Sequence, residues 1–479
     1  MTIQLLTGIA LSLTLSAGAQ RARPNVLFLF ADDLACDGLA ALGNREIISP
    51  NMDGIVRSGV SFANTYNMGG WNGAISIASR SQLITGRYLW NTHRIEGGKY
   101  AAQLANREMW PQVMKDAGYK TFMTGKWHMT AIKPEQVFDQ VALSRIGGMP
   151  GDTPAGYNRP LAKEDDWLPW DKSQGGYWSE GEHWSEKQAD ATIRYIEQNK
   201  EAKEPLFIYC AFNAPHDPRQ SPKEFVDLYP VEKIGIPENF LSEHPFNKAM
   251  GAGRDLRDER LAPFPRTPYA IRKHRQEYYA IISHLDTQIG RILTALHENG
   301  LAENTLIILT SDNGLAMGSH GLLGKQSMYD HSMKIPLVIS GCGLPAGRVH
   351  KELVYLQDLV PTLYQIAGIA KPAHDEFSSL LPIIEDREGA HGRDAVYGAY
   401  MMKQRMIRNE RYKLFLIPDA RQVYLFDMMV DPLETINLYG ESQYDAEVRR
   451  LALRYRQLAV ESGDTFDLTA CFPDIFRDH

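Results

Sequence analysis

The sequence predicts an α/β fold in which a large mixed, mostly parallel sheet is sandwiched between helices, with a smaller C-terminal antiparallel-sheet subdomain. Three patterns support this prediction: short apolar runs that end abruptly in polar residues, helical periodicity between those runs, and alternating segments after about residue 371. Nearly continuous Val, Ile, Leu and Phe indicates strands that are covered on both faces, as in a parallel sheet between two helical layers.

The expected strands of the large sheet are apolar runs of four to nine residues. They span residues 25–31, 121–124, 205–213, 305–310 and 335–340. The clearest helix spans residues 276–298, where apolar residues recur at steps of three and four until Gly300 ends the pattern. Alternating segments at 405–417 and 423–429 predict the C-terminal antiparallel sheet.

The N-terminus has the pattern of an export signal. An apolar run from Leu5 to Leu15 precedes the small residues 16–19, as in a signal peptide. We therefore expect a signal peptide over 1–19, a catalytic α/β domain over 20–371, an α+β subdomain over 372–479, and a periplasmic or secreted location. No later run reaches the ~18 apolar residues of a membrane span, so we expect no membrane partner. A net charge of −7 provides no general attraction for nucleic acid, and we expect none as a partner.

Ionisable side chains follow four of the predicted strands. Because the carboxyl ends of parallel strands meet at one edge of a sheet, these side chains are expected to lie together. They are Asp32 and Asp33, Lys126 and His128, His216, and Asp312 with Asn313. Adjacent carboxylates repel one another unless a cation neutralises them, and oxygen ligands favour calcium or magnesium over zinc or iron. Taken singly, each acidic pair is also typical of an ordinary turn.

Residues 76–87 predict a short helix that ends near Gly86, with Ser76 just before its first turn. Backbone amides and the helix dipole favour an anion at that position, although an N-cap serine is the alternative interpretation. With the strand before Asp32, this segment resembles the sulfatase signature. In that signature a Cys or Ser, followed by x-Pro/Ala-x-Arg and a downstream Thr-Gly-Arg, is oxidised to formylglycine.

The resemblance covers nearly the whole mature chain, and the matching motifs occur in the family's order. They are Pro24-Asn25-Val26 through Asp33, Thr124-Gly125-Lys126-Trp127-His128, Asn213-Ala214-Pro215-His216, Asp286 through Gly290, Ser311 through Gly314, Gly324-Lys325, Asp358 through Thr362, Phe426-Asp427, Asp431-Pro432 and Asn437-Leu438. Two departures are Ser76, where Cys is commoner, and Ala78, where Pro is commoner. The serine form is similar to that of bacterial sulfatases matured by a radical enzyme before export.

The resemblance implies a fold of the alkaline-phosphatase-like superfamily and a cation, calcium in preference to magnesium. The implied ligands are Asp32, Asp33, Ser76, Asp312 and Asn313. Ser76 would carry the formylglycine modification, whose hydrate attacks sulfur and then expels sulfate. The implied partners are a formylglycine-generating maturase and a sulfated small molecule or glycan.

The resemblance also implies roles in proton transfer and charge stabilisation. Asp312 would accept the proton of the attacking hydroxyl, and His128 would take the second proton. His216 with Lys325 would protonate the leaving alkoxide. The remaining implied residues, which would hold the hydrate and the sulfate oxygens, are Arg80 and Lys126.

Export together with an aromatic insertion favours a sulfated carbohydrate as substrate. The alternatives are a phosphodiesterase or phosphonate hydrolase on the same scaffold, and a non-catalytic sulfoglycan-binding protein. The aromatic residues of the insertion are Tyr157, Trp167, Trp170, Tyr177, Trp178 and Trp184, which either stack on sugar rings or anchor the segment.

Several other residues remain without a motif that assigns them a role. The arginines of residues 254–275 alternate with acids, which predicts a solvated, self-paired surface. His320 and His331 are expected only to support the residues that contact the substrate or to contact the substrate themselves. Four scattered cysteines lack metal-site spacing and are interpreted as free thiols.

Overall fold

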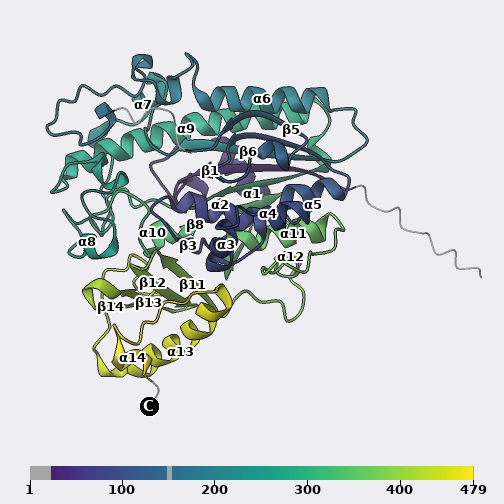
Figure 1. Ribbon diagram of the computed structural model, residues 1–479. Coiled ribbons are helices and arrows are strands. Elements are labelled where there is room, and N and C mark those ends of the chain that lie inside the picture. The colour runs from purple at the N-terminus through teal and green to yellow at the C-terminus, as the bar shows by residue number, and fades with distance from the viewer. Residues whose placement is uncertain (1–22, 148–153, 478–479) are drawn as a thin grey trace, which may run out of the picture.

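The structure is a computed structural model that describes residues 23–147 and 154–477, so the expected signal peptide over 1–19 lies outside the described residues. Its strands form two sheets (Figure 1). The large sheet contains β1 (Asn25–Asp32), β2 (Gly59–Tyr66), β4 (Lys120–Lys126), β5 (Gln140–Arg145), β6 (Leu206–Pro215), β7 (Thr305–Ser311), β8 (Lys334–Ile335), β9 (Leu337–Ser340) and β10 (Arg348–Tyr355). The small sheet contains β3 (Gly69–Gly70), β11 (Ala395–Tyr400), β12 (Gln404–Asn409), β13 (Tyr412–Ile417) and β14 (Gln422–Asp427).

The large sheet has the order β10-β2-β9-β7-β1-β6-β4-β5, with β8 beside β2. Strands β7, β1, β6, β4 and β5 are parallel neighbours, whereas β9 runs antiparallel to β7 and β2. The predicted fold class is therefore confirmed. The expected apolar runs all form strands, but β2, β5 and β10 were not predicted. Strand β5 is only partly buried and β10 begins exposed, so neither has a continuous apolar run.

Strand β1 explains why the large sheet needs helices on both faces. Every residue of Asn25–Asp32 is buried. Leu27, Leu29 and Ala31 belong to one apolar cluster, and the alternate residues Val26, Phe28 and Phe30 belong to another. Since successive side chains of a strand point to opposite faces, both faces of this strand are covered.

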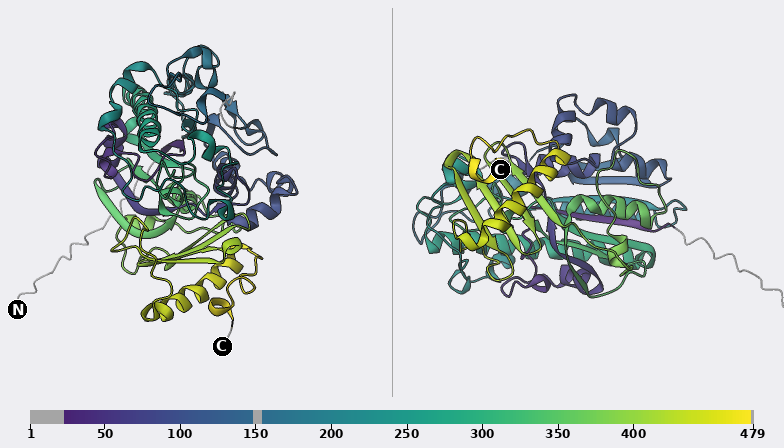
Figure 2. Two further views of the ribbon diagram at one scale, coloured as in Figure 1. Left: turned by 90° about the vertical axis from the view of Figure 1, so that its left-hand side faces the viewer. Right: turned by 90° about the horizontal axis from the view of Figure 1, so that it is seen from below.

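Helices form the covering layers (Figures 1 and 2). One apolar cluster includes residues of α1 (Pro50–Ser58), α6 (Trp184–Gln198) and α9 (Pro268–Glu298), and the other includes residues of α2 (Ile75–Thr85), α5 (Trp110–Asp116), α11 (Leu359–Ile366) and α12 (Leu381–Ile384). Shorter helices are α3 (Leu89–Glu96), α4 (Ala101–Ala105), α7 (Lys223–Asp227), α8 (Asn247–Met250) and α10 (Asp330–Met333). The predicted helix over 276–298 is confirmed and begins about two turns earlier, at Pro268, where Thr267 caps its first turn.

The small sheet is an antiparallel meander of β11, β12, β13 and β14. The predicted alternating segments at 405–417 and 423–429 correspond to β12, β13 and β14, whereas β11 was not predicted. Helices α13 (Asp445–Ser462) and α14 (Pro473–Phe476) pack together beside it (Figure 2). The short strand β3 joins β11 in parallel, so residues 69–70 from the N-terminal half complete this sheet. A Cβ on Gly69 would lie 2.0 Å from the oxygen of Ala399, and only glycine permits this approach. The boundary at 371 remains a prediction.

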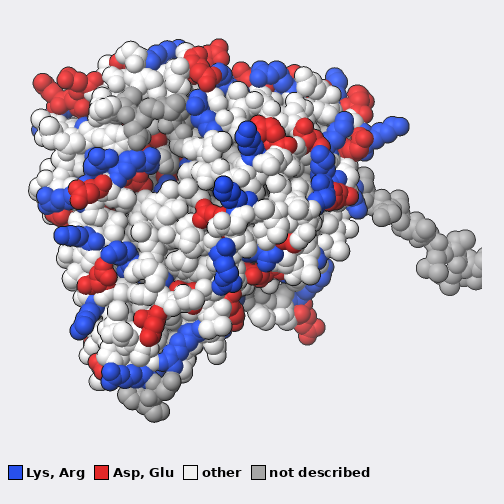
Figure 3. Space-filling model, in the orientation of Figure 1, with Lys and Arg blue, Asp and Glu red and all other residues white. Residues whose placement is uncertain are grey.

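The aromatic insertion is anchored by its own rings. Trp167, Tyr177, Trp178 and Trp184 are at most 5% exposed, which supports the anchoring interpretation over sugar stacking for these four. Lys, Arg, Asp and Glu side chains are interspersed on the face shown in Figure 3. Within the described residues, no helix combines the length and apolar character needed to span a membrane.

Candidate active site

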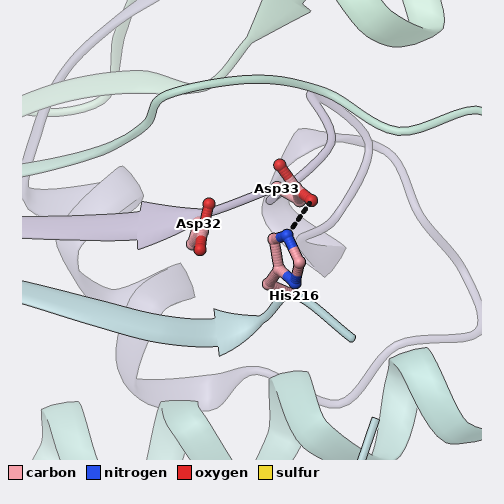
Figure 4. A group of neighbouring side chains, drawn as sticks. All are labelled: Asp32, Asp33 and His216. Carbon is pink, nitrogen blue, oxygen red and sulfur yellow. Dashed lines mark ion pairs between the residues drawn. The ribbon is translucent and has the colours of Figure 1, made fainter. Parts of the chain in front are cut away.

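Acidic groups converge at the carboxyl end of β1. Asp32 is the last residue of that strand, Asp33 follows it, and His216 directly follows β6 (Figure 4). One potential metal-ligand atom from each of these three side chains lies within 4.8 Å of the other two. Asp312 follows β7, the other neighbour of β1, in the parallel register that pairs Ala31 with Ser311. Parallel pairing therefore brings these distant segments to one edge.

Asp33 ties the ends of β1 and β7 together. Its backbone lies in the left-handed region (φ 67°), which residues other than glycine adopt rarely. Its amide donates to Asp312 Oδ1 at 3.1 Å, and the next amide, of Leu34, donates to Ser311 Oγ at 2.8 Å. These bonds hold the acidic side chains of Asp33 and Asp312 in adjacent positions.

Ser76 lies among these acids. Ser76 was predicted to lie just before the helix, but it is the second residue of α2; the helix ends at Thr85, immediately before Gly86, as expected. Ser76 Oγ donates to Asp32 Oδ1 at 3.3 Å and accepts from Asn313 Nδ2 at 3.2 Å and Lys325 Nζ at 3.4 Å. The side chain of residue 76 therefore faces the acidic cluster.

Three buried cations pair with the three carboxylates. Lys126 Nζ contacts Asp32, and Lys325 Nζ lies 2.6 Å from each oxygen of Asp33. Arg80 Nε donates to Asp312 Oδ2 at 2.9 Å, and its Nη2 lies 4.0 Å from Asp32. All six side chains are at most 3% exposed. Because water is excluded, these contacts fix the charged groups in position.

The buried charges shift the pKa values of neighbouring groups. Burial alone would raise the pKa of Asp32, but the charges of Lys126, His216 and Arg80 outweigh it and hold that pKa well below its ordinary value. For Asp33, burial predominates over the attraction of Lys325 and raises the pKa to about 6. Burial, and then the charge of Lys126, lower the pKa of His128, so its imidazole is neutral.

The acidic cluster fits a metal ion. Asp32, Asp33, Asp312 and Asn313 supply oxygen atoms, and all four residues are at most 2% exposed. Asn313 donates through Nδ2 to Ser76, while its buried Oδ1 has no hydrogen-bond partner among the described residues. A carboxylate with a raised pKa and an unpartnered amide oxygen are what a hard cation would stabilise. These residues therefore could hold a divalent cation.

A cavity of about 280 Å³ opens onto the cluster. Its lining includes Ser76, Lys126, His128, His216 and Lys325, so five of the predicted catalytic residues border one cavity, whereas Arg80 is buried and does not line it. Gly125 allows Lys126 to reach this position, since a Cβ there would lie 1.9 Å from the oxygen of Ala211. Like Asp33, His128 has a left-handed backbone (φ 61°), a strained conformation of the kind that clusters at functional sites.

Part of the cavity lining was not predicted from the sequence. Leu256, Arg257, Asp258 and Gln326 line it together with Gly73 and Ala74. Arg257 was expected in a solvated, self-paired surface. It does pair with Asp258, at 2.7 Å, but it also lines the cavity, where its Nη2 lies 3.1 Å from His216 Nε2. Arg266 pairs within the same segment as well, with Glu259, but it is 2% exposed and therefore not solvated. No local signal distinguishes these arginines from their solvated neighbours.

The remaining candidates lie outside the catalytic cavity. His320 stacks on Tyr329 with ring centroids 3.8 Å apart, and neither His320 nor His331 lines the cavity that holds Ser76. All four cysteines are free thiols, as predicted. Burial raises the pKa of Cys36 to about 12, so it provides no thiolate nucleophile.

The fold and this site define an α/β protein with a buried acidic cluster beside a serine at the carboxyl edge of its large sheet. Residues 24–369 match the family model described as Sulfatase, and residues 318–461 match the model described as N-sulphoglucosamine sulphohydrolase, C-terminal. The chain belongs to the sulfatase family. It is a sulfuric ester hydrolase.

Curated relatives match along most of the chain. An N-acetylglucosamine-6-O-sulfatase of Bacteroides thetaiotaomicron is 26% identical to this chain, and the match covers 92% of this chain and 88% of the relative. An arylsulfatase of Clostridium perfringens is also 26% identical, covering 89% and 92% respectively.

Solved structures share the fold. One, in complex with its substrate D-glucosamine-2-N,6-O-disulfate, has a TM-score of 0.72 at 23% identity, covering 92% of this chain and 99% of that chain. A phosphonate monoester hydrolase from Silicibacter pomeroyi has a TM-score of 0.72 at 20% identity, covering 92% and 96%. The fold is therefore common to sulfatases and phosphonate hydrolases.

Proposed function

We propose that this enzyme hydrolyses the sulfate ester of a sulfated carbohydrate to an alcohol and inorganic sulfate, using a formylglycine hydrate derived from Ser76. The observation that carries the proposal is the position of Ser76 Oγ, within 3.4 Å of Asp32, Asn313 and Lys325 at the base of a cavity. The relative named for an N-acetylglucosamine sulfate and the fold neighbour bound to a glucosamine disulfate support a sugar as the alcohol.

The proposed ligands of the cation are Asp32, Asp33, Asp312, Asn313 and residue 76. Calcium is preferred to magnesium, because calcium accepts six to eight oxygen ligands in flexible geometry, whereas magnesium demands a nearly ideal octahedron. When bound, the cation would withdraw charge from the sulfate oxygens and relieve the repulsion among the carboxylates.

The chain's own side chains supply donors and proton acceptors around residue 76. Arg80 and Lys126 are fixed cations that hold oxygen atoms as negative charge develops. Asp312 is assigned as the acceptor of the attacking hydroxyl's proton, and neutral His128 as the acceptor of the second. Lys325 and His216 both lie beside Asp33 and line the cavity, where they can donate a proton to the leaving oxygen. Each proton transfer therefore has a candidate group in or behind the cavity lining.

Maturation is tested by intact-mass analysis of the peptide that contains Ser76, from protein produced with a formylglycine-generating maturase. Oxidation of serine to formylglycine removes two hydrogens. An unchanged mass, with no turnover, would support a non-catalytic sulfoglycan-binding protein instead. We also propose that the protein is exported to the periplasm or beyond, and fractionation of the native host tests this location.

The reaction class is tested with 4-nitrophenyl sulfate and the matching phosphate and phosphonate esters. We expect kcat/KM for the sulfate to exceed both others. Preference for the phosphonate would assign this chain to the activity of the fold neighbour from Silicibacter pomeroyi.

A further inference from the structure

The cavity has a second polar wall beside the proposed leaving-group donor. Arg257 and Asp258 belong to a 3-10 turn and its flank within residues 218–275, a segment that crosses the carboxyl edge of the large sheet. Arg257 Nη2 lies 3.1 Å from His216 Nε2. A group bound by Arg257 is therefore next to the alcohol that leaves the sulfate.

This wall is rigid. Arg257 donates to Asp258 Oδ1 through Nε at 2.9 Å and through Nη2 at 2.7 Å, and Asp217 Oδ1 lies 3.5 Å from the same Nη2. Gln326 Nε2 donates to Asp258 Oδ2 at 2.7 Å. The guanidinium remains about one-third exposed, with its side chain at 32%. A charged donor and a charged acceptor are thus held side by side at the cavity surface.

Both carboxylates of this wall are ionised. Burial would raise the pKa values of Asp217 and Asp258, but Arg257 and other nearby cations outweigh it and lower both. The wall therefore combines carboxylate acceptors with a guanidinium donor, and this pairing suits hydroxyl groups, which both donate and accept hydrogen bonds. Asp258 accepts three hydrogen bonds in the described part of the chain, and a carboxylate accepts about four.

The size of the cavity limits what can reach this wall. At about 280 Å³ it lies below the range of about 300–1,000 Å³ that encloses drug-sized ligands. The space suits one sugar ring with its sulfate directed at Ser76.

We infer that Arg257 and Asp258 form hydrogen bonds with hydroxyl groups of the sulfated sugar ring, and so select a ring with free hydroxyls beside the scissile sulfate. This inference rests on the proposed sulfatase function and specifies the substrate of that site.

The experiment compares Arg257→Met and Asp258→Asn with wild type. The substrates are 4-nitrophenyl sulfate and the monosulfated monosaccharide that the matured wild-type enzyme hydrolyses fastest in a panel. We expect each variant to raise KM for the sugar sulfate about 10–100-fold more than KM for the aryl sulfate, because only the sugar loses charged hydrogen bonds. The matched control is Arg254→Met, since Arg254 is 60% exposed and pairs with Glu243 outside the cavity lining. It should leave both KM values unchanged.

Binding to unreactive protein provides a second readout. In a Ser76→Ala background, calorimetry should show that Arg257→Met weakens binding of the sugar sulfate at least tenfold more than binding of 4-nitrophenyl sulfate. Asp258→Asn should likewise weaken binding of the sugar sulfate more than binding of 4-nitrophenyl sulfate.

Equal losses for sugar and aryl substrates, or a loss confined to kcat, would overturn the inference and leave Arg257 as a positioning residue for His216. Turnover of aryl sulfate with none of any sugar sulfate would also overturn it, while sulfatase activity stands. If the matured enzyme hydrolyses no sulfate ester at all, the proposed function fails instead.

Discussion

Glu434 should make the stability of this protein depend on pH. Its side chain is 3% exposed, accepts the amide of Asp330 at 2.6 Å and lies 2.6 Å from Lys413 Nζ. Burial raises its pKa from 4.5 to about 7, with Lys413 opposing and the charge of Asp330 adding to the rise. Because the folded state binds this proton more tightly than the unfolded state, the stabilisation is complete below about pH 4.5. It is lost as the pH rises through about 7.

The magnitude follows from the difference between about 7 and 4.5, at about 1.4 kcal/mol for each unit of pKa. Glu434→Gln removes this titration. Between pH 5 and pH 8, the free energy of unfolding of the variant should therefore rise by about 2–3 kcal/mol relative to wild type. Urea denaturation at both pH values measures the difference, and the exposed Glu410→Gln is the control. A difference between Glu434→Gln and wild type that is the same at pH 5 and pH 8 would refute the reasoning.

Three further predictions concern the active site and its support. Ser76→Ala should lower kcat for 4-nitrophenyl sulfate by at least about 10³-fold, because no nucleophile remains. The circular dichroism spectrum should be unchanged. Substantial turnover by this variant would show that Ser76 is not the source of the nucleophile. Chelation with EGTA should abolish turnover, and calcium should restore it at lower concentration than magnesium; equal recovery with both ions would contradict the calcium assignment. Asp358→Asn should lower the free energy of unfolding, measured in urea, by about 3 kcal/mol. The reason is that buried Asp358 pairs with Arg393 and accepts hydrogen bonds from the amides of Tyr355 and Ser378. A loss below about 1 kcal/mol would contradict that role.

Much of the fold could be predicted because β-structure buried on both faces leaves a local trace. The apolar run of β1 reflects its two covered faces, and the polar residues that end it mark the edge of the sheet. Parallel strands present their carboxyl ends together, so the order of motifs along the chain was sufficient to group Asp32, Asp33 and Asp312. Strand β3 left no such trace, because it consists of two glycines whose pairing partner lies more than 300 residues away.

Tertiary structure alone decided how the site is completed. The sequence determined which residue types follow each strand, but the 3.1 Å contact between Arg257 and His216 depends on the path of residues 218–275 across the sheet edge. The same holds for Asn313 Oδ1, which meets no hydrogen-bond partner within residues 23–147 and 154–477. Local periodicity records whether a side chain is buried. Which charge it meets there is set by long-range packing, and for this enzyme that packing shapes the wall proposed to select the substrate.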